Sequence, residues 1–136
     1  MLGELGTLFD HAEKRAEELD VASVVAAVDP HGNLVLLMRM TGAPEFAIHM
    51  ATQKAYTAIS MGLETAELTP LVQPGEPLFG LIEASGGRLL PFGGGAVVAL
   101  EDGTSLGIGV SGGTTGQDVA VLEAIQAAAH TPQSVP

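Results

Sequence analysis

The chain has 136 residues, of which 46% are hydrophobic and 15% charged, and its 16 acidic residues against five Lys and Arg give a net charge of −11. One domain of this length can fold without a disulfide or a structural metal, and the lack of Cys excludes thiolate chemistry and Cys-ligated metal sites. The negative charge opposes binding to nucleic acid and to anionic lipid, so neither partner is expected. No uncharged stretch reaches the ~20 apolar residues of a spanning helix, and the N-terminus does not resemble a signal peptide, so the expected location is the cytoplasm.

Hydrophobic periodicity predicts a first helix over residues 2–19, with one apolar and one charged face. Two apolar runs follow, at 22–28 and 34–40, and the segment 29–33 between them contains the Pro, Gly and Asn typical of a turn. These runs predict an antiparallel hairpin. A second helix is expected over residues 45–61.

The second half of the chain contains more Gly and Pro, and its predicted elements are shorter. An irregular segment at 62–75, broken by Pro70 and Pro74, is followed by a short helix at 77–84 and a short strand at 88–91. A hairpin then has strands at 96–100 and 105–110. The last helix is capped by Thr114 or Thr115 and runs to about residue 129.

This order of elements predicts one α+β domain (α/β in the broad sense) over residues 1–130, with a flexible C-terminal tail at 131–136. Hairpin connections in place of alternating strand–helix–strand units favour an antiparallel sheet of five strands with helices packed on it.

Lys54 is the most informative single residue. The periodicity of the helix at 45–61 places it within a stripe of small apolar side chains, while His49, Gln53 and Tyr56 lie on the polar side. A buried ammonium needs a partner, so three environments are open: a structural carboxylate or backbone carbonyl, the edge of the helix, or a pocket with an anionic ligand. In a pocket, a lowered pKa would suit Lys54 to general-base catalysis.

The Gly-rich segment 109–116 joins the last strand to the last helix. Its backbone N–H groups and the helix N-terminus are suited to a carboxylate or phosphate. The alternative is that the glycines serve only the geometry of the strand-to-helix connection.

The four His residues show no paired metal-ligand spacing, so no protein-ligated metal site is expected. His11 lies on the charged face of the first helix, and His49 begins the polar face of the second. Each has a solvated surface role as its simplest interpretation, and each is a candidate axial ligand for haem.

Three motifs in a fixed order resemble a known family. They are Ala51-x-x-Lys54-Ala55-x-Thr57-Ala58, then Gly93-Gly94, then Gly109-Val110-Ser111-Gly112-Gly113 followed by Gln117-Asp118. Together they resemble the GlcG/HbpS-like family, whose members have been called haem-binding or haem-degrading domains. One branch is the C-terminal domain of the PduO-type corrinoid adenosyltransferase. The resemblance extends over about residues 5–128.

The resemblance implies a profilin-like fold with a five-stranded antiparallel sheet between helices. It also implies homo-oligomers, from dimers to octamers, and ligands such as haem, corrinoids or small organic acids. By likeness, the pocket positions of the family correspond to Arg39, Lys54, Gly93, Gly94 and Ser111. A haem-ligating His on the first helix would fall near His11.

Three functions are compatible with these features. The first is an oligomeric protein that binds an anionic or carbonyl-bearing organic molecule, with His49 added to the pocket positions above; isomerase- or lyase-type acid–base catalysis by Lys54 is left open. The second is binding, sensing or degradation of haem or another tetrapyrrole, with His11 or His49 as the ligand. The third is a non-catalytic accessory subunit.

Overall fold

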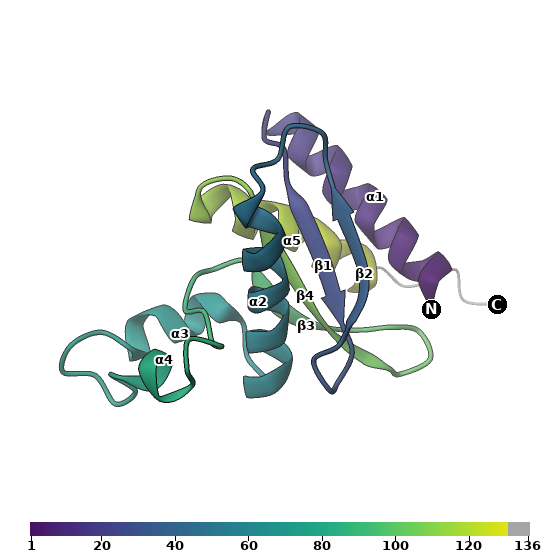
Figure 1. Cartoon of the computed structure of the whole chain (residues 1–136). Coiled ribbons are helices and arrows are strands. Elements are labelled where there is room, and N and C mark those ends of the chain that lie inside the picture. The colour runs from purple at the N-terminus through teal and green to yellow at the C-terminus, as the bar shows by residue number, and fades with distance from the viewer. Residues whose placement is uncertain (131–136) are drawn as a thin grey trace.

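The computed structural model describes residues 1–130, so the predicted tail at 131–136 lies outside the described residues. Figure 1 shows a twisted antiparallel sheet with α1 and α5 behind it and α2 in front. In chain order the elements are α1 (Leu2–Glu18), β1 (Val24–Val28), β2 (Leu34–Arg39), α2 (Phe46–Met61), α3 (Thr65–Leu71), α4 (Leu81–Ala84), β3 (Gly95–Ala99), β4 (Ser105–Ser111) and α5 (Thr115–His130).

The strand order in the sheet is β2-β1-β4-β3. Both predicted hairpins are confirmed: β1 pairs with β2 and β3 pairs with β4, each in the antiparallel direction. The two hairpins meet where β1 and β4 pair, with Val24 opposite Ser111. No helix among residues 1–130 is long and apolar enough to cross a bilayer.

The predicted fifth strand at 88–91 is wrong, because the described sheet has four strands. Side chains, and not a neighbouring strand, bind the backbone here. The Leu89 N–H donates to the Ser85 hydroxyl at 3.2 Å, and the Leu90 N–H donates to the Thr57 hydroxyl at 2.9 Å. Backbone donors that side chains already satisfy do not need a strand partner.

The expectation of an irregular segment at 62–75 is also wrong in part, because α3 forms there with Pro70 inside it. Contacts with the rest of the domain stabilise α3 despite Pro70. Leu68 is fully buried, and the Thr65 hydroxyl accepts a 2.8 Å hydrogen bond from the Gly95 N–H. The helix predicted at 77–84 shortens to α4.

The two faces of the sheet are packed differently. The face towards α1 and α5 buries large aliphatic side chains, including Leu106, Ile108 and Val110 of β4. The face towards α2 has glycines in β4, and a Cβ added at Gly109 would overlap the carbonyl oxygen of Ala51. The backbone of α2 therefore lies directly against the backbone of β4.

We expect Gly109→Ala to lower the free energy of unfolding by about 2 kcal/mol, because the new Cβ forces α2 away from the sheet. Gly6→Ala in α1 is the control: a Cβ there has no neighbour within 4 Å, so the change should be neutral or stabilise by up to about 1 kcal/mol. Urea denaturation measures both. Equal effects of the two changes would contradict the close packing.

Candidate functional site

Lys54 forms a buried ion pair with Asp118 at the end of the sheet where β3 begins. The Lys54 side chain comes from α2 and the Asp118 side chain from α5, and the residues are 2% and 4% exposed. Lys54 Nζ lies 3.0 Å from Asp118 Oδ2 and donates a 2.8 Å hydrogen bond to the Val110 carbonyl oxygen. Gly94 lies over the pair with φ +122°, and a Cβ there would stand 3.1 Å from Nζ.

Burial works against both charges of this pair. It lowers the pKa of Lys54, and the charge of Asp118 offsets part of that effect. It likewise raises the pKa of Asp118, and Lys54 offsets part of that effect. A hydrogen bond offsets more of the cost of burying the Asp118 charge, because Asp118 Oδ1 accepts the Gly113 N–H at 3.0 Å. The pair therefore resembles a fixed structural contact more than a reactive amine.

The structure brings four of the six predicted pocket residues to this end of the sheet. Gly93 and Gly94 precede β3, Ser111 ends β4 with 3% exposure, and Lys54 lies beside them. The three best-formed hollows among residues 1–130 do not include Lys54. The environment matches the structural alternative stated for Lys54, while its predicted role in catalysis or ligand binding stays a prediction.

The other two predicted pocket residues lie apart from this cluster. Arg39 ends β2, is exposed, and stands opposite Val24, two strands from Ser111. His49 is exposed on the outer side of α2.

The connection from β4 to α5 is closed by its own side chains. Besides the Gly113 N–H on Asp118, the Thr114 N–H donates to Gln117 Oε1 at 2.9 Å, and the Gln117 N–H donates to the Thr114 hydroxyl at 3.2 Å. Thr114 is thus the cap, as predicted. Because these N–H groups already have acceptors, the connection offers few donors to an external anion.

Two hollows do contain predicted residues. A hollow of about 550 Å³ lies between α1, the end of α5 and the turn at 101–103, and His11 is in its wall. A groove of about 410 Å³ follows the outer side of α2 and contains His49. Both volumes are within the range of small-molecule sites. The described residues contain no group of three His, Asp or Glu that would hold a metal ion.

Sequence reasoning missed Arg88, which lines the α2 groove with His49, Gln53 and Tyr56. The helical periodicity already placed those three on one polar side. Arg88 has no comparable signal, because it joins them only through the fold of the 85–92 segment.

Removing one partner of the ion pair should leave the other charge buried alone. We expect Lys54→Met and Asp118→Leu each to lower the free energy of unfolding by about 3–5 kcal/mol. The double variant Lys54→Met/Asp118→Leu should recover most of that loss, because it buries no charge. Denaturant unfolding measures this cycle, and a double variant as unstable as the sum of the single variants would show that the two side chains are not coupled.

Comparison with known proteins connects the chain to solved and curated relatives. A crystal structure of the Klebsiella pneumoniae protein ORFY superposes with a TM-score of 0.90 at 33% identity, covering 98% of this chain and 92% of that one. A crystal structure of a PduOC:heme complex superposes with a TM-score of 0.86 at 37% identity, covering 94% and 93%. The corrinoid adenosyltransferase PduO of Citrobacter freundii is 40% identical over 92% of this chain.

The chain spans only 37% of the length of that adenosyltransferase, so the activity of the whole enzyme does not transfer with the likeness. The family model for haem degrading protein HbpS-like matches residues 4–127, nearly the whole described structure. This match confirms the resemblance inferred from the sequence motifs. The chain therefore belongs to the HbpS-like family of haem degrading proteins.

Proposed function

We propose that the chain is a small-molecule-binding domain that holds haem in the hollow beside α1, with His11 as the iron ligand. The observation that carries this proposal is the imidazole in the wall of a hollow of about 550 Å³. The heme complex of the PduOC neighbour supports haem as the ligand.

The residues around the hollow fit such a group. Thr7, Leu8 and Ala128 give a wall of small and apolar side chains, and a Cβ added at Gly3 would meet nothing within 4 Å, so the surface of α1 is open there. His11 is the only usual haem ligand in this wall.

The carboxylates of Glu4 and Glu101 give the hollow beside α1 a negative charge. Glu4 accepts the Glu101 N–H at 3.0 Å, which ties α1 to the turn at 101–103. Their negative charge disfavours haem propionates at that side of the hollow. Bound haem supplies one-electron and O₂ chemistry at its iron, while the contribution of these residues is ligation, orientation and charge.

Titration with haemin tests the proposal. The wild type should give a saturable Soret shift, and His11→Ala should lose it, because the iron loses its ligand. His31→Ala, in the exposed turn between β1 and β2, is the matched control and should keep the shift.

Two results would overturn the assignment. An unshifted wild-type spectrum would refute haem binding. Loss of the shift in His49→Ala but not in His11→Ala would move the ligand to the α2 groove.

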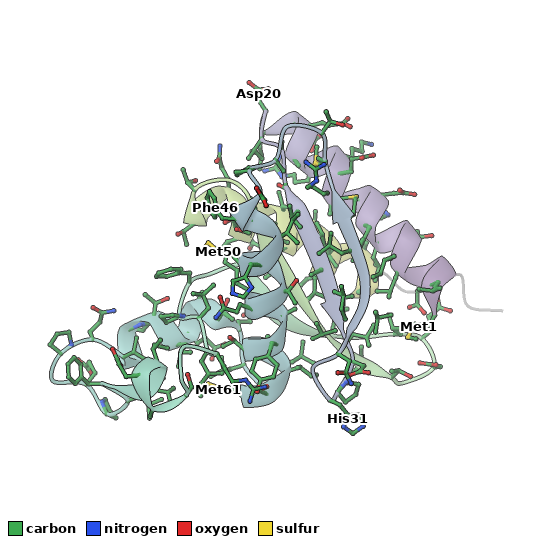
Figure 2. The ribbon with its side chains drawn as sticks, in the orientation of Figure 1. Met1, Asp20, His31, Phe46, Met50 and Met61 are labelled. Atoms are coloured by element: carbon green, nitrogen blue, oxygen red, sulfur yellow. The ribbon has the colours of Figure 1, made fainter. Side chains whose placement is uncertain are left out.

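We also propose that the chain assembles with copies of itself. Three of its four Phe residues are largely exposed: Phe46 at 63%, Phe79 at 64% and Phe92 at 45%. Figure 2 shows Phe46 at the start of α2, and the segment with α3 and α4 projects from the body of the domain in Figure 1. Aromatic residues are enriched at protein–protein interfaces relative to the rest of the surface, which supports an interface that includes some of these side chains.

Light scattering after size-exclusion chromatography tests the assembly. The wild type should have a mass that is a multiple of 13.8 kDa, and Phe79→Glu should weaken association about tenfold or more, because it places a charge in the contact. Asn33→Glu adds the same charge to an exposed turn and should leave the mass unchanged. A monomeric wild type would contradict the proposal.

A further inference from the structure

The groove on the outer side of α2 has a polar floor and a glycine-lined rim. His49, Gln53 and Tyr56 come from successive turns of α2, and the segment 86–88 forms the opposite wall. This groove is separate from the hollow beside α1, since the two share no lining residue.

Arg88 is the unusual group in this groove. Its guanidinium carbon lies 4.6 Å from the centre of the Tyr56 ring, a cation–π contact. Among residues 1–130, no carboxylate lies within 4.0 Å of it; the ion pairs found there involve Arg15 and Lys54. In a chain with 16 acidic and five basic residues, a guanidinium without a carboxylate partner is available to an external anion.

Both ends of Arg88 are held in place. Its side chain stacks on Tyr56, and Gln53 Nε2 donates to the carbonyl oxygens of Gly87 at 2.6 Å and of Arg88 itself at 3.3 Å. A guanidinium fixed in this way loses little conformational entropy when it pairs with a ligand.

The glycines shape the space around Tyr56. A Cβ added at Gly32, which has φ +84°, would lie 2.7 Å from the Tyr56 ring, so glycine allows the turn between β1 and β2 to close against that ring. At Gly86 and Gly87 a Cβ would meet nothing within 4 Å, so this side of the groove is open.

We propose that this groove binds a small organic carboxylate with a flat apolar body. The Arg88 guanidinium pairs with the carboxylate, His49 offers a further hydrogen bond, and the body of the ligand lies along the open rim at Gly86 and Gly87, next to the guanidinium that covers the Tyr56 ring. A guanidinium can donate two parallel hydrogen bonds to one carboxylate, so it favours carboxylates over anions that can accept only one of those bonds. This site extends the proposed function and does not depend on haem.

Tyr56 makes the test direct, because the chain has one Tyr and no Trp. In protein labelled with ¹³C-tyrosine, titration with benzoate should change the NMR chemical shifts of the Tyr56 ring in a saturable way. Methyl benzoate, which has the same ring without the charge, should not produce that saturable shift.

Arg88→Gln should weaken benzoate binding about tenfold or more, because it removes the charge partner of the carboxylate. Arg15→Gln removes one arginine from α1, on the other side of the sheet, and is the matched control. His11→Ala should retain benzoate binding even if it loses haem.

Three outcomes would overturn the proposal. One is the absence of a saturable shift with benzoate at any soluble concentration. Another is equal weakening by Arg88→Gln and Arg15→Gln, which would indicate a general charge effect. A third is equal binding of benzoate and its methyl ester, which would indicate an apolar contact only.

Discussion

A buried ammonium–carboxylate contact joins parts of the chain that would otherwise meet only through the sheet. Lys54 lies in the helix on one face and Asp118 in a helix on the other face, and the Lys54 amine also donates to the carbonyl of Val110 in β4. The contact requires the small residues around it, because a side chain at Gly94 would crowd the Lys54 amine. Such a pair adds little net stability, but it penalises any arrangement that separates its members, so it favours one placement of α2 and α5.

The residues that form this buried contact are different from those that line the proposed binding surfaces. The buried side of α2 packs against glycines of β4, and the Lys54 amine bonds within the fold. The polar side of the same helix remains free to form the groove with Arg88, while α1 presents His11 to the other hollow. In this account, ligands bind on the outward sides of α1 and α2, and the motif residues around Lys54 hold α2 and α5 in position.

Much of the fold could be predicted from local patterns, but contacts between distant segments could not. Periodicity and turn residues located α1, α2 and both hairpins, because these elements depend on neighbours in sequence. The strand expected at 88–91 failed because the Thr57 hydroxyl binds the backbone there, and α3 was missed because buried Leu68 outweighs Pro70. For Lys54, the apolar stripe was evident, but its partner lies 64 residues later.

Selective chemical modification of Lys54 tests this account most directly, because Lys14 and Lys54 are the two lysines of the chain. Reductive methylation with ¹³C-formaldehyde, followed by peptide mass analysis, compares an exposed amine with a buried one. In the folded protein we expect rapid modification of Lys14 and protection of Lys54, with both modified after unfolding. Modification of Lys54 in the folded protein at the rate of Lys14 would show that this amine is open to solvent and ligands, and would contradict a buried structural ion pair.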